Sequence, residues 1–455
     1  MIHRILIANR GEIAVRIIRT CKEMNIETVA VYSTADKDAL HVQLADYAVC
    51  IGKGPSKDSY LNMKNILSAA CMTGCDAIHP GFGFLSENAK FARLVMQCGL
   101  LFIGPNPDVI ERMGDKNNAR MAMKEAGIPV IPGSKDILHS VEEAYEMAES
   151  IGYPVLLKAS NGGGGRGMRR ANNSEELKDA YDSAKAEAKV CFGDDAVYME
   201  KFIVEPKHVE VQLAADKFGN VIHLYERDCS AQRRNQKILE EAPCHALREE
   251  TRKRMLEDAV NACKAVGYDS VGTIEFLLDA RGQYYFMEMN TRIQVEHTIS
   301  EEICGIDLIK LQIRIADHHR LPYKQKDIIC RGHAIECRIN AENIKKDFAP
   351  SVGKISFMNF PKGRNVRIES AMYTGYAIPP FYDSMIAKII TFAPTRLECI
   401  KRMRIALEEL LIEGIDTNIE FQYLLLHHPV FVSGNYDTGF MEVFIKELKE
   451  DGTII

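Results

Sequence analysis

The sequence predicts a mixed α/β and α+β protein of several domains, and three observations support this. The chain has 455 residues, which is more than one hydrophobic core usually holds. Its first third alternates short apolar strands with amphipathic helices, a pattern that is typical of a parallel sheet. Clusters of proline and glycine interrupt this pattern further along the chain and indicate domain boundaries.

A βαβ unit opens the chain. We expect a strand over His3–Ala8, a helix over Gly11–Met24 and a second strand over Glu27–Tyr32, which together imply a parallel sheet. The turn after the first strand lacks the GxGxxG spacing of a dinucleotide site. The loop HPGFGFLSEN favours a βα turn whose helix is capped by Ser86. Further strands are expected at 47–51, 77–79 and 101–103.

The region from 105 to 133 is rich in proline and glycine, and we expect a domain boundary in it close to Gly114. Lys116 follows the boundary and precedes an expected helix over Asn117–Ala126. A lone lysine at the start of a helix is usually solvated, so its position alone indicates little about function.

Four consecutive glycines, Gly162–Gly165, follow an expected strand over Val155–Leu157 that ends in Lys158. The stretch is no Walker P-loop, because GK[ST] is missing, and no Rossmann turn, because a helix does not start at once. Ordering so many glycines costs entropy. The composition therefore favours a flap whose backbone N–H groups close over phosphates, with charge from Lys158 and Arg166, over a simple flexible turn.

Two strands are expected after the flap, at Ala196–Ile203 and His208–Asp216. The second alternates cleanly and presents three polar side chains on one face: His208, Glu210 and Gln212. The next segment, Glu226–Pro243, is dense in charges of both signs. Such a run is usually a solvated face, and we expect that for several of its side chains, Lys237 excepted.

A β-hairpin around a glycine turn near residue 282 brings carboxylates together. If Glu275 opposes Phe286, Glu288 lies diagonally across from Glu275 on the same face, about 7–8 Å away between backbones. Two carboxylates at that spacing repel each other unless a cation lies between them. Oxygen-only ligands, with Asn290 one step further, suit Mg²⁺ or Mn²⁺ rather than zinc.

The stretch from Met287 to His297 carries a polar group at every second position. In an extended chain these groups share one face: Glu288, Asn290, Arg292, Gln294 and Glu296. Carboxylates, a carboxamide and a guanidinium in one row favour a functional site over an ordinary half-exposed strand. With the glycine-rich flap and its lysine, the row predicts an ATP- and Mg²⁺-dependent phosphoryl-transfer enzyme without a P-loop.

The last third gives mainly structural signals. Strands are expected at His333–Ile339, Lys354–Phe357 and Ala387–Phe392. A helix over Thr395–Leu411 would turn five apolar side chains inward: Ile400, Met403, Leu407, Leu410 and Leu411.

Composition and charge exclude several functional classes. With 46% hydrophobic and 26% charged residues the chain is typical of soluble globular proteins, and no apolar run is long enough to span a membrane. A net charge of -6 gives no general attraction to nucleic acid or to anionic lipid. The 13 cysteines form no CxxC pair, which favours reduced thiols, a cytoplasmic location and no structural zinc.

Six strings carry a resemblance to a known family: HPGFGFLSEN, KASNGGGGRGM, ERDCSAQRRNQK, EMNTRIQVEH, RGHAIECRINAE and PPFYDSMIAK. In order and spacing they are similar to those of the biotin carboxylases, most closely the subunits of bacterial acetyl-CoA carboxylase, from Met1 to about Leu448. The resemblance implies an N-terminal Rossmann-like domain over 1–114 and an ATP-grasp domain over 115–330, with a lid at about 131–203. A C-terminal α+β domain over 331–448 completes the implied fold.

The resemblance also implies a reaction and its residues. Bicarbonate is phosphorylated by ATP to carboxyphosphate, which yields CO₂ for attack by N1′ of biotin. The implied ATP contacts are Lys116, Lys158, Gly164, Gly165, Glu200, Lys201, Phe202, Ile203, His208, Gln232 and Asn235, and the implied metal ligands are Glu275, Glu288 and Asn290. The implied bicarbonate and biotin residues are Lys237, Arg292, Gln294, Val295, the base Glu296, and Arg338, which steadies the biotin enolate.

Five positions depart from the family pattern. Asn235 stands where the family usually has His, which puts one nucleotide contact in doubt. The other four departures touch neither the bicarbonate nor the base positions: Phe82, Asn161, Thr298 and Val352.

The resemblance implies partners as well. Lys124 lies in an expected helix rather than at a hairpin tip, so we expect biotin to arrive on a separate biotin carboxyl carrier protein, with carboxyltransferase subunits completing the complex. Charges on the first helix (Arg16, Arg19 and Glu23) are either solvated or part of a homodimer interface. The alternatives are a subunit of another acyl-CoA or pyruvate carboxylase, another ATP-grasp ligase that joins a carboxylate to an amine, and an idle dinucleotide-binding module.

Overall fold

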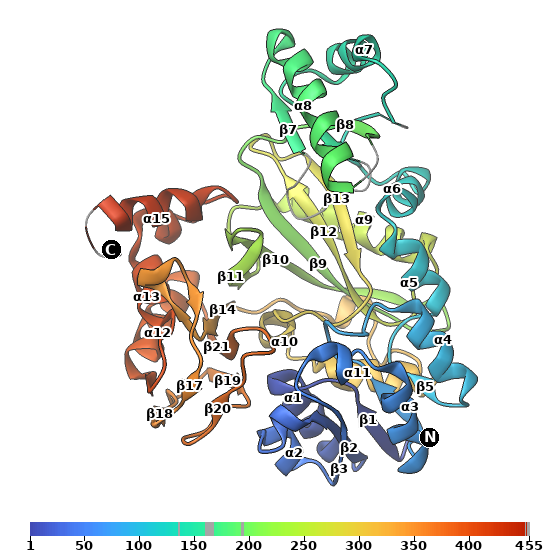
Figure 1. Cartoon of the computed structure of the whole chain (residues 1–455), viewed down its shortest axis with the longest axis vertical. Coiled ribbons are helices and arrows are strands. Elements are labelled where there is room, and N and C mark those ends of the chain that lie inside the picture. The colour runs from blue at the N-terminus through green and yellow to red at the C-terminus, as the bar shows by residue number, and fades with distance from the viewer. Residues whose placement is uncertain (135–136, 160–167, 193–194, 451, 453–455) are drawn as a thin grey trace.

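The computed structural model describes residues 1–134, 137–159, 168–192, 195–450 and 452. It has three parts, seen in Figure 1 as a blue part at the bottom, a green and yellow part above it, and an orange and red part beside them. The α/β and α+β fold class expected from the sequence is confirmed. No helix in these ranges is long and apolar enough to cross a bilayer.

The N-terminal part is a five-stranded parallel sheet with the strand order β3-β2-β1-β4-β5. The strands are β1 (Arg4–Ile7), β2 (Glu27–Ser33), β3 (Tyr47–Gly52), β4 (Ala77–His79) and β5 (Leu101–Phe102). The helices are α1 (Gly11–Glu23), α2 (Leu40–Leu44), α3 (Met63–Met72), α4 (Ala89–Gln97) and α5 (Pro107–Gly114). All five strands expected from the sequence are confirmed to within one or two residues at each end.

The expected cap at Ser86 is wrong. Helix α4 is capped by Asn88, whose side chain accepts a hydrogen bond from the backbone N–H of Phe91. An asparagine two residues further on provides the same carbonyl acceptor for the orphan N–H groups of the first turn. Ser86 is buried one turn earlier, in the loop that follows β4.

The central sheet has eight antiparallel strands in the order β13-β12-β9-β10-β11-β14-β21-β19. Its strands are β9 (Lys207–Ala215), β10 (Val221–Arg233), β11 (Gln236–Ala242), β12 (Val271–Leu278), β13 (Tyr284–Asn290), β14 (His333–Asn340), β19 (Val366–Ser370) and β21 (Met385–Ala393). Pairing of β11 with β14 joins the middle and C-terminal regions into one sheet, a continuity that the alternation pattern of the sequence does not indicate.

A smaller unit lies at the top of Figure 1 and has its own hydrophobic core. It contains a three-stranded sheet in the order β7-β6-β8, covered by two helices. These elements are β6 (Val155–Ala159), β7 (Met168–Ala171), β8 (Val197–Lys201), α7 (Val141–Ile151) and α8 (Ser174–Phe192). A separate core is the construction expected of a part that can move as a body.

The remaining helices cover the central sheet and its C-terminal extension. Around the middle they are α6 (Lys116–Glu125), α9 (Glu249–Ala265), α10 (His297–Cys304) and α11 (Leu308–Ala316). Toward the C-terminus they are α12 (Arg396–Glu409), α13 (Ile419–His427), α14 (Pro429–Ser433) and α15 (Phe440–Glu450). Short pairing strands complete the C-terminal part: β15 (Glu342–Asn343), β16 (Ala349–Pro350), β17 (Gly353–Lys354), β18 (Phe357–Asn359), β20 (Ala377–Ile378) and β22 (Leu411–Glu413).

Two expectations for the C-terminal part are wrong in detail. The strand expected over 354–357 is divided between β17 and β18, which pair with different partners. Helix α12 ends at Glu409, and Leu411 begins β22 with half of its surface exposed rather than facing inward. The backbone turns extended at Leu410, so pairing with β18 overrides the helical periodicity of the last apolar residue.

The charged side chains on α1 are not all exposed to solvent. Arg16 is buried within the chain and forms ion pairs of 3.0 Å with Glu301 and with Asp307. Arg19 remains half exposed and pairs with Glu369, and Glu23 is exposed. A charge opposite an apolar helix face can therefore bind another part of the same chain.

Candidate active site

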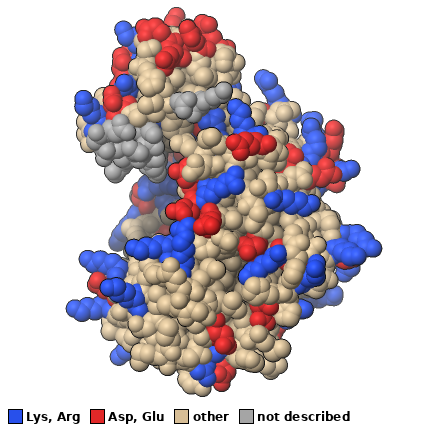
Figure 2. All heavy atoms as spheres, turned by 90° about the vertical axis from the view of Figure 1, so that its right-hand side faces the viewer, with Lys and Arg blue, Asp and Glu red and all other residues tan. Residues whose placement is uncertain are grey.

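A cavity of about 1360 Å³ lies where the three parts meet. Its wall contains most of the side chains singled out in the sequence: Lys116, Lys158, Glu200, His208, Gln232, Asn235, Lys237, Glu275, Glu288, Asn290, Arg292, Gln294, Val295, Glu296 and Arg338. In Figure 2 basic and acidic side chains meet beside the notch that separates the upper lobe from the body. Gly164 and Gly165 of the expected flap lie outside the described residues.

The register of the β12–β13 hairpin differs from the predicted one. Glu275 lies directly opposite Glu288, not diagonally across from it, and Phe276 pairs with Phe286. The reason is a β-bulge between these pairs, which leaves Met287 as an extra residue on β13. The bulge brings the two carboxylates closer than the predicted arrangement would.

This carboxylate pair fits a divalent cation. Glu288 has no hydrogen bond or ion pair within the described ranges, and burial together with the charge of Glu275 raises its pKa. Burial would also raise the pKa of Glu275, but Lys237 and His208 outweigh it and lower that pKa. Asn290 donates to Glu275 over 2.8 Å from the end of β13. A cation between these oxygen ligands would offset the repulsion that now raises the pKa of Glu288.

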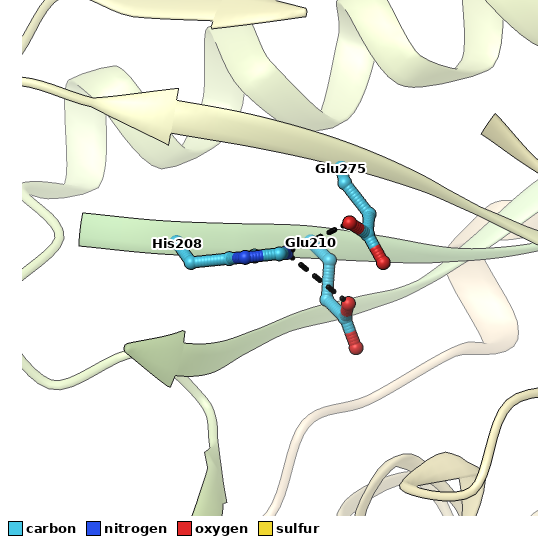
Figure 3. Close-up of side chains that lie close together, drawn as sticks. All are labelled: His208, Glu210 and Glu275. Atoms are coloured by element: carbon cyan, nitrogen blue, oxygen red, sulfur yellow. Dashed lines mark ion pairs between the residues drawn. The ribbon is translucent and has the colours of Figure 1, made fainter. Parts of the chain in front are cut away.

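Figure 3 shows a second cluster, in which His208, Glu210 and Glu275 approach one another. The His208 Nε2 lies 3.0 Å from Glu275 and 3.7 Å from Glu210. The Gln232 amide nitrogen donates both to the Cys229 carbonyl and to His208 Nδ1, so the ring proton is on Nε2. With this tautomer the Nε2 proton faces the two carboxylates, which fits a contact that orders Glu275.

Lys237 is the central cation of the site. Its ammonium lies 2.5 Å from Glu210, 3.0 Å from Glu275 and 2.6 Å from Glu296. Burial would lower the pKa of Lys237, but the three carboxylates outweigh it and raise that pKa well above its ordinary value. Lys237 is therefore charged at all physiological pH values and keeps Glu296 ionised.

Arg338 reaches the same carboxylate from the neighbouring region. It extends from β14 and donates to Glu240 over 2.6 Å and to Glu296 over 2.9 Å. Burial would raise the pKa of Glu296, but Lys237 and Arg338 lower it. Glu296 is thus an ionised carboxylate held between two cations, one from each side of the β11–β14 junction.

Strand β13 ends at Asn290, so the alternation of the polar row does not continue as a strand. The chain turns through 291–296 and then enters α10, yet the row from Glu288 to Glu296 still lines one cavity. Arg292 donates to Glu87 and to Asn290, each over 2.8 Å, while Gln294 donates to Glu275 over 2.8 Å. The five polar side chains therefore line one cavity, but Met287 and Val295 line it as well, so this lining does not test the alternating face expected of an extended strand.

Arg227 is the main residue that the sequence reasoning missed. Its guanidinium is fully buried and donates to five side chains: Glu210, Gln212, Thr273, Gln294 and Ser300. It lies beneath the cavity and fixes Glu210 and Gln294 from behind. Glu87 was also missed as the partner of Arg292; its position within the HPGFGFLSEN string was the only signal available.

The solvated reading of the charge run 226–243 is wrong for most of the run. Its five fully buried charges are Glu226, Arg227, Asp228, Glu240 and Glu241, on the paired strands β10 and β11. Both faces of these central strands are covered, so a charged residue must find a partner whichever way it points. Only the turn between β10 and β11, in the middle of the run, matches the expectation, with Arg234 exposed.

The turn between β10 and β11 explains the unusual Asn235. Arg234 and Asn235 have φ values of +51° and +63°, as in a two-residue type I′ hairpin. Asparagine tolerates this left-handed conformation better than most residues, because its short polar side chain bonds locally. Asn235 lines the cavity.

The implied ATP contacts at 200–203 are only partly in the cavity wall. Glu200 lines the cavity and forms an ion pair with Lys158. Lys201 instead donates to the carbonyls of Gly152 and Tyr153, and Phe202 lies under the guanidinium of Arg170. Lys201, Phe202 and Ile203 do not line the cavity in this arrangement.

Comparison with known proteins covers the whole chain. Three family models match: "Biotin carboxylase, N-terminal domain" over 1–110, "Carbamoyl-phosphate synthase L chain, ATP binding domain" over 115–324, and "Biotin carboxylase C-terminal domain" over 336–443. Biotin carboxylase 1 of Bacillus subtilis is 57% identical, over 98% of this chain and 99% of its own.

Two solved structures have the same fold. The biotin carboxylase of Campylobacter jejuni superposes with a TM-score of 0.90 at 51% identity, over 97% of this chain and 99% of its own. The biotin carboxylase domain dimer of Hydrogenobacter thermophilus 2-oxoglutarate carboxylase, in complex with MgADP, ADP and bicarbonate, gives 0.89 at 51% identity and 97% of each chain.

Proposed function

This chain belongs to the biotin carboxylase family and is therefore an ATP-dependent ligase, and we propose that it carboxylates biotin on a separate carrier protein, as the first half-reaction of acetyl-CoA carboxylase. The observation that carries the proposal is the ionised Glu296 between Lys237 and Arg338. This arrangement fits a base that takes a proton from bicarbonate, which is a poor nucleophile until it loses that proton.

The proposed first step uses Glu296 and its neighbours. Bicarbonate takes the place of part of the Lys237–Glu296–Arg338 contact, its hydroxyl proton passes to the Glu296 carboxylate, and a carbonate oxygen attacks the γ-phosphorus of ATP. ADP leaves and carboxyphosphate forms. Arg292, Gln294 and Val295 complete the proposed pocket, in which planar guanidinium groups match the planar anion.

The proposed ATP site lies between the upper unit and the central sheet. Support comes from two lysines that line the cavity, Lys116 at the start of α6 and Lys158 on β6. The other proposed contacts are Gly164, Gly165, Glu200, Lys201, Phe202, Ile203, His208, Gln232 and Asn235. We expect the upper unit to move before Lys201, Phe202 and Ile203 can contact the base, because they do not line the present cavity.

Glu275, Glu288 and Asn290 are the proposed ligands of Mg²⁺, or of Mn²⁺. When bound, the cation supplies charge neutralisation for the transferred phosphoryl group. The chain's own contribution is the hairpin register, which fixes two carboxylates opposite each other on β12 and β13.

In the second proposed step carboxyphosphate breaks down to CO₂ and phosphate, and the released phosphate takes the proton from N1′ of biotin. The N1′ nitrogen then forms its bond to the carbon of CO₂, while Arg338 stabilises the oxygen of the enolate form. The guanidinium suits this role because it is charged and lines the cavity. Burial would lower the pKa of Arg338, but Glu240 and Glu296 outweigh it and raise that pKa. Removing a proton from N1′ leaves negative charge on the ureido oxygen, and a fixed cation there lowers the energy of that charge.

We further propose three domains, at 1–114, at 115–330 with a lid at about 131–203, and at 331–448. We also propose that the chain forms a homodimer and that it assembles with a biotin carboxyl carrier protein and with carboxyltransferase subunits. The dimer is supported by the related H. thermophilus domain, described as a dimer. That relative belongs to 2-oxoglutarate carboxylase, so another acyl-CoA or keto-acid carboxylase is the competing assignment. The described cysteines are free, in keeping with a cytoplasmic location.

Assays of the purified chain test whether it has biotin carboxylase activity. MgATP hydrolysis should require bicarbonate and should be stimulated by free biotin; ATP turnover without bicarbonate dependence would overturn it. Product analysis with candidate amines separates it from a carboxylate–amine ligase. The role in acetyl-CoA carboxylase is tested by copurification with carrier and transferase subunits. A carboxylation assay with acetyl-CoA and competing acceptors then identifies the final substrate.

A further inference from the structure

A fully buried lysine, Lys388, contacts the backbone of the proposed bicarbonate pocket. Its ammonium, on β21, donates to the carbonyl oxygen of Val295 over 2.6 Å. Val295 and Glu296 form the turn that leads into α10, and both line the cavity. Lys388 lies behind this turn and is absent from the cavity wall.

Lys388 and Arg338 form a cross-strand pair. They lie directly opposite each other on the antiparallel strands β14 and β21, so their side chains share one face of the sheet. Arg338 binds the Glu296 carboxylate over 2.9 Å, and Lys388 binds the carbonyl of the residue before it. The two cations therefore hold the same turn, one by its side chain and one by its backbone.

Like charges directly opposite in a sheet destabilise it, so each cation needs carboxylates nearby. Arg338 has Glu240 and Glu296. Lys388 has an ion pair of 3.3 Å with Glu12 of α1, and the charges of Glu336 and Glu369 add to it. Burial would lower the pKa of Lys388, but these carboxylates outweigh it and raise that pKa, so the ammonium is charged.

The polar atoms around Lys388 form fewer hydrogen bonds than those around an ordinary structural cation. Both oxygens of Glu12 are buried without a hydrogen-bond donor within the described residues. In the part of the chain that the structure describes, the Lys388 ammonium makes one hydrogen bond, to Val295, beside its ion pair with Glu12, although an ammonium offers three donors. An apolar side chain of similar volume would avoid the desolvation of this charge, so stability alone does not explain it.

Other contacts hold the far end of the same turn. Thr298 donates to Glu336 on β14, and the His297 Nδ1 lies 2.8 Å from the carbonyl of Gln294. These contacts fix the first turn of α10, whereas Lys388 is the side chain that fixes the residue immediately before Glu296. A small rotation of the Val295–Glu296 peptide would move the carboxylate away from Lys237 and Arg338.

We propose that Lys388 is a positioning residue that holds the Val295 carbonyl and so sets the position of the Glu296 carboxylate toward bicarbonate. The inference rests on the proposed function, because it assumes that Glu296 accepts the bicarbonate proton. Lys388 touches no substrate; it acts through the backbone of the turn. A misplacement of about 1 Å at a reacting group costs roughly 100-fold in rate.

The test compares three variants at Lys388 in the full-length protein. Lys388→Met and Lys388→Gln lose the contact, the second because its side chain is one bond too short. We expect bicarbonate-dependent ATP cleavage to fall about 10- to 100-fold in kcat, the usual range when a supporting contact behind a functional group is removed. The KM for MgATP should stay within about twofold, because the ATP contacts are untouched. Lys388→Arg keeps charge and donors and should recover most of the loss.

A matched control perturbs the same strand without touching the turn. Ile390→Val creates a small cavity in the core beside β14 and should lower the melting temperature slightly while leaving kcat unchanged. If Lys388→Met does not fold, Lys388→Gln decides, because the amide suits the polar surroundings.

The outcomes distinguish a failure of the proposed function from a failure of the positioning role of Lys388. A wild-type protein without bicarbonate-dependent ATP cleavage would overturn the proposed function. A wild-type protein with that activity, but Lys388→Met or Lys388→Gln within twofold of it, would overturn the positioning role alone. So would a loss that appears equally in the KM for MgATP, or that Lys388→Arg does not relieve, since either would indicate general damage.

Discussion

Glu240 and Glu241 are neighbours on β11, and both are fully buried, yet they point to opposite faces and belong to two different charge clusters. Glu240 joins the Lys237 cluster, which contains Lys237, Glu210, Glu240, Glu275, Glu296 and Arg338. Glu241 joins the Glu241 cluster, which contains Glu241, His333, Arg396 and Tyr436. Both clusters contain buried carboxylates and an arginine, and both are anchored on β11.

The Glu241 cluster is closed. One carboxylate oxygen of Glu241 accepts from Arg396 and lies 2.7 Å from His333, and the other accepts from Arg396 and Tyr436. Burial would raise the pKa of Glu241, but His333 and Arg396 lower it well below its ordinary range. Nothing here is left for a ligand to satisfy.

The Lys237 cluster is open and has more carboxylates than cations. It faces the cavity, and Glu288 beside it has no partner within the described ranges. Burial raises the pKa of Glu240 although Arg338 opposes the shift. The difference teaches that burial and charge do not identify a site; a site is where charges remain incompletely compensated and open to a ligand.

The largest expected effect is that of Glu288→Gln, which breaks the open cluster at its unpaired carboxylate. Losing one ligand of a phosphate-bridging cation removes several kcal/mol of charge stabilisation, so metal-dependent ATP turnover should fall by about 1,000-fold. The melting temperature should stay the same or rise, because the neutral amide removes repulsion with Glu275. Coupled ADP assays and calorimetry measure both, and turnover above a tenth of wild type would contradict the assignment.

Arg396→Met makes the opposite test, in the closed cluster. It leaves the buried Glu241 without its bidentate partner, which should cost about 3 kcal/mol in the free energy of unfolding. Activity per folded molecule should not change, because Arg396 does not line the cavity. Urea unfolding gives the free energy, and the double variant Arg396→Met/Glu241→Gln should recover part of it. A loss of kcat in folded protein would show that the two clusters are coupled.

Arg338→Met should separate the two half-steps of the proposed reaction. Alone it leaves Glu240 without its cation, so the double variant Arg338→Met/Glu240→Gln is the cleaner protein. Biotin carboxylation should fall about 100-fold, the usual cost of losing one donor at a developing oxyanion. Bicarbonate-dependent ADP release should stay within about fivefold, because Lys237 still holds Glu296. If labelled bicarbonate reaches biotin at the wild-type rate, the role proposed for Arg338 is wrong.

The sequence predicted the open cluster better than the closed one. Glu275, Glu288, Lys237 and the row up to Glu296 carry patterns that a strand or a family string makes visible. Alternation cannot reveal Arg227, because its five partners come from separate segments of the chain: β9, β12, the turn before α10, and α10 itself. Nor can alternation reveal a β-bulge, because a bulge depends on the register in which two strands pair.

The Glu241 cluster was invisible for the same reason. Glu241 looked like part of a solvated charge run until the pairing of β11 with β14 placed His333 beside it. Arg396 and Tyr436 arrive from the C-terminal region, more than 150 residues away along the chain. A closed cluster is built from distant residues that each look ordinary, whereas an open site keeps several of its groups within one short stretch.

The smallest expected effect is a difference in pH dependence between Glu240 and Glu241. The folded pKa of Glu241 is lowered from 4.5, so its contribution to stability is present above pH 4.5 and is lost as pH falls below that value. Burial raises the folded pKa of Glu240 above 4.5 against the opposing charge of Arg338, so its contribution to stability is lost as pH rises above 4.5. Relative to wild type, Glu241→Gln should therefore gain stability toward acid pH, and Glu240→Gln should gain it toward pH 8, by at most about 1.4 kcal/mol per pH unit. Urea midpoints between pH 3.5 and 8 measure both trends, and trends of the same sign would contradict the division into an open and a closed cluster.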